Sequence, residues 1–141
     1  MEVIELYSYQ PGSIKPIPFF SMSVSAGIPM PVDSDIDQVI DLNEFLVEHP
    51  AATFFARVRG NSLDEIGISD GDILIVDSVV DVSDSKVVVA TINGELTVKI
   101  YRNVDGEEFL QSGNMQFMPM RIEPYMEYDI IGVVTKVIHT L

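Results

Sequence analysis

Residues 59–72 read RGNSLDEIGISDGD and place one serine, Ser62, in a glycine-flanked turn between two apolar runs. A serine hydroxyl is a weak nucleophile until a neighbouring base takes its proton, so chemistry at Ser62 requires a second residue from elsewhere in the chain. Residues 62–65 also match a capping box, in which the serine side chain accepts from an amide three residues on and Glu65 reaches back. The stretch alone therefore allows either a nucleophile or a helix cap.

The sequence on both sides of this turn has the pattern of β-strands. Strands are predicted where apolar residues alternate with polar ones or where β-branched residues cluster, at residues 53–59, 72–77, 86–92, 95–101 and 130–138. Between two of them lies Asn93-Gly94, which is typical of a two-residue type I′ hairpin, and Asp105-Gly106 offers a further turn. The pattern predicts a mainly β domain with antiparallel strands.

The predicted strand 95–101 carries a lysine in its middle. Side chains alternate across a strand, so Leu96, Val98 and Ile100 share one face and Lys99 lies on the other. Such a lysine often lies along a sheet with its ammonium in water. If it is partly buried, desolvation favours the neutral amine, which can accept a proton from serine. Lys99 is thus a candidate base for Ser62.

Other catalytic arrangements have weaker support. The only histidines are His49 and His139; neither has the spacing of a metal site, and the chain has no cysteine. A Ser-His-Asp triad with His139 has no positive support, and His49 is expected to be a surface or cap residue. No P-loop or dinucleotide fingerprint is present. We therefore expect no metal and no cofactor.

The first part of the chain differs in composition from the rest. Residues 1–40 contain five prolines, which favour extended structure, so we predict an N-terminal arm over 1–40 and a β domain over 41–141. Within the arm, Ala26-Gly27 is a break of small residues in an otherwise apolar segment. A short helix is predicted at the start of the domain, with Leu42, Phe45 and Leu46 on one face.

Charge and hydropathy restrict the expected location and partners. No run approaches the roughly 18 apolar residues that span a bilayer, and the start lacks the basic segment of a secretory signal, which predicts a soluble, cytoplasmic protein. The 141 residues include 22 acidic and 8 basic ones, for a formal net charge of −14. Such a charge repels a phosphate backbone, so we expect protein partners and no direct nucleic-acid binding.

The order of these features resembles the LexA/UmuD family of self-cleaving serine peptidases, and most closely its UmuD branch. The resemblance runs from about residue 19 to the C-terminus. It rests on Ala26-Gly27 and on residues 59–63, 67–77 and 94–99, and for the UmuD branch on residues 40–46 and 49–53. It implies a compact β domain like that of LexA and of signal peptidases, with a short N-terminal helix and an extended N-terminal arm.

The resemblance also implies a function. Ser62 would be the nucleophile and neutral Lys99 the general base, and together they would cut the chain's own Ala26-Gly27 bond and release residues 1–26. The family resemblance further implies a homodimer, cleavage stimulated by a RecA filament, and a processed form that joins a UmuC-like subunit of an error-prone translesion DNA polymerase in the SOS response. Two positions depart from the family: Asn61 where aspartate is usual, and Leu63 where methionine is usual.

Two other functions are compatible with the residues. One is a non-catalytic, dimeric, β-rich interaction module in which Ser62 only caps a helix. The other is an intermolecular peptidase that resembles bacterial signal peptidases, which is disfavoured because no membrane anchor is apparent.

Overall fold

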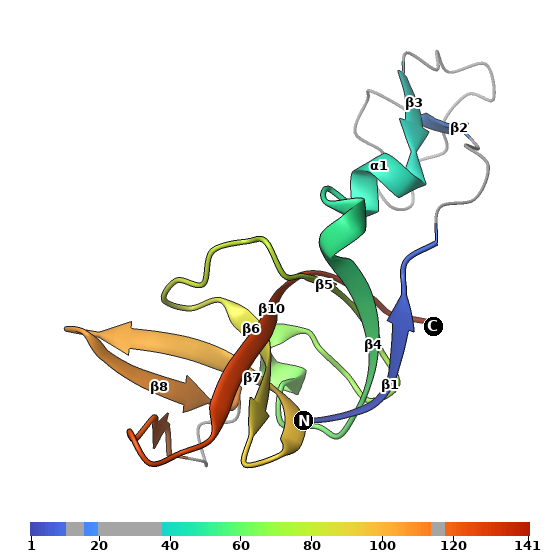
Figure 1. The fold of residues 1–141 in the computed structure, drawn as a ribbon. Helices are drawn as coiled ribbons and strands as arrows, with labels where there is room; N and C mark the ends of the chain where they lie inside the picture. Colours follow the sequence, from blue (N-terminus) through green and yellow to red (C-terminus); the bar gives the residue numbers. More distant parts are fainter. Residues whose placement is uncertain (11–15, 20–37, 114–117) are drawn as a thin grey trace. The chain divides into compact units, whose positions relative to one another are not determined.

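The structure is a computed structural model that describes residues 1–10, 16–19, 38–113 and 118–141 (Figure 1). The chain divides into two compact units. The larger contains Met1–Tyr9 and His49–Leu141, and the smaller contains Gln10–Glu48. No helix in the described parts of the chain has both the length and the apolar character needed to cross a membrane.

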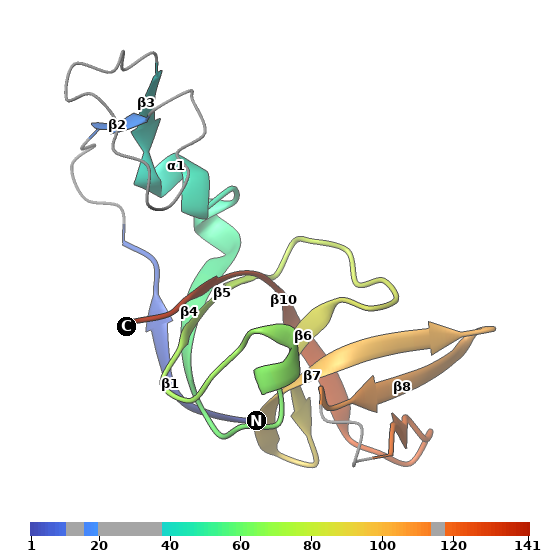
Figure 2. The same ribbon diagram turned by 180° about the vertical axis from the view of Figure 1, so that it is seen from behind.

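The larger unit is built on one antiparallel sheet. Over the described residues its strand order is β1-β4-β5-β10-β6-β7-β8-β9, and β1 also pairs with β7. Figures 1 and 2 show β1 lying alongside β4. The strands are β1 (Glu2–Ser8), β4 (Thr53–Arg59), β5 (Ile73–Asp77), β6 (Val87–Ile92), β7 (Glu95–Val104), β8 (Glu107–Gln111), β9 (Met120–Arg121) and β10 (Tyr128–Ile138). The predicted mainly β fold is confirmed.

The two predicted turns are present. Asn93 and Gly94 both have positive φ, at 49° and 82°, and join β6 to β7 with Ile92 opposite Glu95. This is the backbone that a type I′ hairpin requires and that asparagine and glycine tolerate best. Asp105-Gly106 joins β7 to β8 in the same way, with φ of 52° and 84°. Local turn chemistry therefore sets the register of three consecutive strands.

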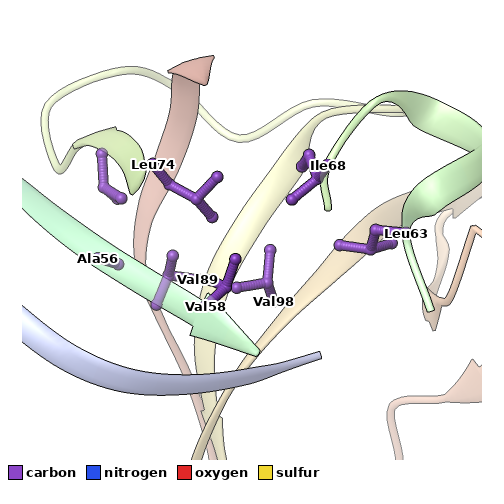
Figure 3. Close-up of a cluster of buried hydrophobic side chains, with 8 residues drawn as sticks. Ala56, Val58, Leu63, Ile68, Leu74, Val89 and Val98 are labelled. Atoms are coloured by element: carbon purple, nitrogen blue, oxygen red, sulfur yellow. The ribbon is translucent and has the colours of Figure 1, made fainter. Parts of the chain in front are cut away.

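The core of this unit lies against the strands that surround the Ser62 turn. Its eight buried residues come from β4, β5, β6, β7 and the turn itself, and Figure 3 draws their side chains between these elements. They are Ala56, Val58, Leu63, Ile68, Leu74, Val76, Val89 and Val98. A second cluster contains Val88, Tyr101, Leu110 and Val133. The turn is thus part of the core packing.

The smaller unit pairs β2 (Pro16–Phe19) with β3 (Gln38–Asp41), followed by α1 (Leu42–Leu46). Asp41 caps this helix by accepting a hydrogen bond from the Asn43 amide at 2.9 Å. The predicted short helix is therefore present. In the larger unit a 3₁₀ turn, η1 (Pro50–Ala52), leads into β4.

The first nine residues were predicted to belong to an extended arm. The structure places Met1–Tyr9 in the larger unit, where Glu2–Ser8 form β1. The division at residue 40 into an arm and a peptidase-like domain stays a prediction. Ala26 and Gly27 lie outside the described residues, so the structure does not place the predicted cleavage site.

Candidate active site

The Ser62 turn is held by one hydrogen bond from a backbone amide to a side chain, by one between backbone groups, and by buried side chains. The Gly60 amide donates to Asp70 Oδ1 at 2.8 Å, which closes the base of the turn. The Leu63 carbonyl accepts from the amide of Ile68 at 3.2 Å, and both of these side chains lie in the core, 0% and 2% exposed. Ser62 therefore precedes a residue that the packing holds in place.

Ser62 does not cap a helix. The 3₁₀ turn η2 (Asp64–Ile66) has Leu63 at its N-cap position and no side-chain cap. Ser62 Oγ is buried and has no hydrogen-bond partner among the described residues. The interpretation of Ser62 as a helix cap is therefore wrong. The short helix starts one residue later than a capping box at Ser62 requires, because the buried Leu63 occupies its N-cap position.

A buried hydroxyl without a partner is uncommon, because most buried polar groups are hydrogen-bonded. The Ser62 amide also donates no hydrogen bond to another described group. The Ser62 hydroxyl and the Ser62 amide thus both keep hydrogen-bonding capacity that no described group uses. This is the pair of groups that acyl transfer uses, one to attack and one to stabilise the oxyanion.

Lys99 lies on β7 as predicted, on the face opposite the buried Val98. It is partly buried, and within the described residues it forms no ion pair and no side-chain hydrogen bond. The nearby amino group of Met1 is also partly buried; burial, and then the charge of Lys99, lower its pKa. No described carboxylate therefore forms a salt bridge with Lys99.

Ser62 and Lys99 line one cavity of about 610 Å³. They come from elements far apart in sequence, and the sheet brings them together. Ser62 Oγ makes no hydrogen bond to Lys99 in this structure. Catalytic contacts are often loose without substrate and tighten when it binds. The rest of the lining combines polar and apolar side chains, from Ile92, Asn93, Glu95, Thr97, Leu110, Ser112, Met118 and Met120.

The two histidines pair with buried aspartates away from this cavity. His139 Nδ1 lies 2.6 Å from Asp72 Oδ1, and His49 Nδ1 lies 2.5 Å from Asp77 Oδ2. Burial opposes ionisation of Asp77, but hydrogen bonds from His49 and from the Val79 amide outweigh it and lower the Asp77 pKa. None of these side chains lines the Ser62 cavity, so a triad through His139 has no geometric support. Among the described residues no group of three or more possible metal ligands was found.

Two residues that follow β8, Ser112 and Gly113, were not predicted to belong to the site. Ser112 is buried and lines the cavity, and Gly113 lies against the backbone of the Ser62 turn. A Cβ on Gly113 would come within 3.1 Å of the Ser62 carbonyl oxygen and 3.2 Å of Leu63 Cα. A single glycine in a loop does not indicate a functional site, so Gly113 could not be predicted from the sequence pattern.

The close approach at Gly113 predicts that Gly113→Ala displaces the Ser62 turn. The contacted atoms are backbone and cannot rotate away, so the turn must shift by a few tenths of an ångström. We expect the rate of any Ser62-dependent reaction to fall by about tenfold, because small misplacements of reacting groups are costly. A cleavage time course checks this, with Gly106→Ala as the control for general destabilisation. Alanine there strains the β7–β8 turn, where φ is 84°, but its Cβ meets nothing within 4 Å and the residue does not line the Ser62 cavity. Equal slowing in both variants would contradict the role of Gly113.

Comparison with known proteins gives consistent matches over most of the chain. Residues 18–135 match the family model described as peptidase S24-like. Protein MucA of Salmonella typhimurium is 40% identical over 120 residues, which cover 84% of this chain and 82% of MucA. Protein ImpA of Salmonella typhimurium is 37% identical over 124 residues, 86% of this chain and 83% of ImpA. The LexA repressor of Psychromonas ingrahamii is 36% identical over 118 residues, 83% of this chain and 56% of that repressor.

Proposed function

The chain belongs to the peptidase S24-like family, as the resemblance to LexA/UmuD self-cleaving peptidases predicted, and we propose that it cuts its own Ala26–Gly27 bond with Ser62 and Lys99. One observation carries this proposal. The unpartnered hydroxyl of Ser62 and the unpaired amine of Lys99 line the same cavity.

The reaction proceeds by acyl transfer. Neutral Lys99 accepts the proton of Ser62 Oγ as this oxygen attacks the carbonyl carbon of Ala26. The resulting oxyanion accepts a hydrogen bond from the Ser62 amide; in other hydrolases the loss of one such donor costs roughly 3–4 kcal/mol. Collapse breaks the Ala26–Gly27 bond, and the Lys99 ammonium gives its proton to the departing Gly27 amine.

A water molecule completes the reaction. Lys99, neutral again, takes a proton from this water as it attacks the ester that links Ala26 to Ser62. Collapse of this second intermediate breaks the bond between the Ala26 carbonyl carbon and Ser62 Oγ, and Lys99 returns the proton to that oxygen. The products are a new carboxylate at Ala26, a new amine at Gly27 and the free Ser62 hydroxyl. Covalent attachment of the substrate bond to the enzyme makes the first encounter intramolecular, which raises its effective concentration.

We place this cleavage in the SOS response, where the chain acts as a UmuD-like accessory subunit of an error-prone translesion polymerase. The proposed partners are a second copy of the chain, a RecA filament that stimulates the cut and a UmuC-like polymerase subunit, in the cytoplasm. The family resemblance supports these assignments. The net charge of −14 is consistent with recruitment through proteins, without contact to phosphates.

The function predicts that a RecA filament on single-stranded DNA accelerates cleavage at neutral pH. Purified full-length chain is incubated with RecA, single-stranded DNA and a slowly hydrolysed ATP analogue, and fragments are identified by mass. We expect residues 1–26 and 27–141, formed faster than with RecA alone. A chain that stays intact with the activated filament would refute the proposed place in the SOS response, whatever its behaviour at alkaline pH.

A further inference from the structure

The family resemblance implies that the cut releases residues 1–26. From the position of β1 in the sheet we infer instead that β1 stays bound to the larger unit after the Ala26–Gly27 bond is cut, so that the processed protein is a complex of residues 1–26 with residues 27–141. The inference rests on the proposed function, because that cut is what separates β1 from the rest of the sheet. Its partner surface is the edge of β4 together with the start of β7, and its occupant is the chain's own N-terminal strand.

Backbone pairing along β4 is the first support. β1 runs antiparallel to β4 with partners from Glu2 opposite Arg59 to Ser8 opposite Phe54, interrupted by one register shift after Val3. Figures 1 and 2 show the two strands side by side. Addition of an extended segment to a sheet edge is a common mode of peptide binding, in which main-chain hydrogen bonds supply affinity. β1 is therefore held as a bound peptide would be.

A second set of contacts joins β1 to β7. The Met1 carbonyl accepts a hydrogen bond from the Val98 amide at 3.1 Å and another from Thr97 Oγ1 at 2.9 Å. Glu2 also pairs in register with Thr97. β1 thus bridges β4, which leads into the Ser62 turn, and β7, which carries Lys99. Loss of β1 would remove a connection between the two elements that bring the candidate catalytic residues together.

Side-chain packing adds to these backbone contacts. Met1 and Val3 are partly buried and pack against the main core cluster, so their removal would expose apolar surface. At the other end of the strand, Tyr9 packs edge to face on Phe55 with ring centroids 6.0 Å apart. These contacts lie at both ends of β1 and hold it along its length.

The ion pairs contribute to register more than to affinity. Arg59 lies 2.7 Å from Glu2 and Arg57 lies 3.4 Å from Glu5. All four side chains are more than a third exposed, and exposed pairs contribute little to stability. Each pair does place opposite charges on residues that face each other across β1 and β4. A shift in the register of β1 along β4 would separate these charges and is therefore disfavoured. Salt is therefore expected to weaken the complex only slightly.

The experiment separates this inference from self-cleavage. In full-length Ser62→Ala, the recognition sequence of a site-specific protease is inserted between residues 20 and 37, and the chain is cut there by that protease. We expect both fragments in one species by native mass spectrometry and gel filtration, and their separation in denaturant. An N-terminal fragment that separates under native conditions would overturn the inference. The added protease makes the cut and Ser62 is absent from this variant, so a chain that fails to cleave itself can still be tested in this way.

A matched pair of variants tests whether the predicted contacts hold the fragment. Val3→Asp places a charge against the core cluster and is expected to release the fragment once the chain is cut. Ile4→Asp changes an exposed neighbour, 41% exposed, and is expected to retain it. Hydrogen exchange gives a second readout, since amides of β4 that pair with β1 should keep their protection after the cut. Equal retention in both variants, or loss of protection in the unsubstituted protein, would contradict β1 as the bound element.

Discussion

Lys99→Met is expected to slow cleavage of the Ala26–Gly27 bond by about 10²–10⁴-fold, the usual contribution of a positioned general base. Methionine keeps a long apolar side chain in the partly buried position on β7 but cannot accept the proton of Ser62. Without that transfer the hydroxyl remains a weak nucleophile. The rate is measured as loss of intact chain at alkaline pH, where a larger fraction of lysine side chains is neutral.

Two further variants make this result specific to Lys99. Lys99→Arg keeps a positive charge but stays protonated, so it is also expected to be inactive. Lys86→Met removes a lysine that is exposed before β6 and does not line the cavity, and it is expected to cleave at the unsubstituted rate. Cleavage by Lys99→Met within a few-fold of the unsubstituted chain would exclude Lys99 as the base.

Leu63→Ala is expected to have the second largest effect, on both stability and rate. The side chain is fully buried in the main cluster, and its truncation is expected to lower the free energy of unfolding by about 2–5 kcal/mol. Loss of this packing also allows the backbone at position 63, and with it the neighbouring Ser62, to move. We therefore expect cleavage to slow by about 10²-fold under conditions where the variant is still folded. Denaturant unfolding and a cleavage time course measure the two effects.

Leu63→Met is the matched control, because it preserves most of the buried volume. It is expected to change the free energy of unfolding by less than about 1.5 kcal/mol and to leave the cleavage rate close to that of the unsubstituted chain. If Leu63→Ala were as stable and as fast as Leu63→Met, core packing could not be what positions the turn.

Much of the fold could be predicted because its signals are local. The Asn93-Gly94 turn sets the pairing of β6 with β7, and alternation along β7 places Lys99 opposite Val98. Turn conformation and strand alternation depend on a few adjacent residues, so a single sequence reveals them. The pairing of β1 with β4 depends on contacts more than forty residues apart in the chain, and the prolines that follow β1 made it resemble an arm.

The candidate site was predictable in its parts and not in its surroundings. Ser62 and Lys99 were singled out by residue type and by family resemblance, and they line one cavity. The capping box was misleading because burial of Leu63, a tertiary effect, outweighs a local pattern. Ser112 and Gly113 were missed because their importance comes only from which backbone they approach.

The central claim, that Ser62 cuts the Ala26–Gly27 bond, is tested most directly by mass spectrometry of the full-length chain and of Ser62→Ala after incubation at alkaline pH. We expect the unsubstituted chain to yield residues 1–26 and 27–141, and Ser62→Ala to stay intact. An intact unsubstituted chain, cleavage at another bond, or equal cleavage in Ser62→Ala would contradict the claim.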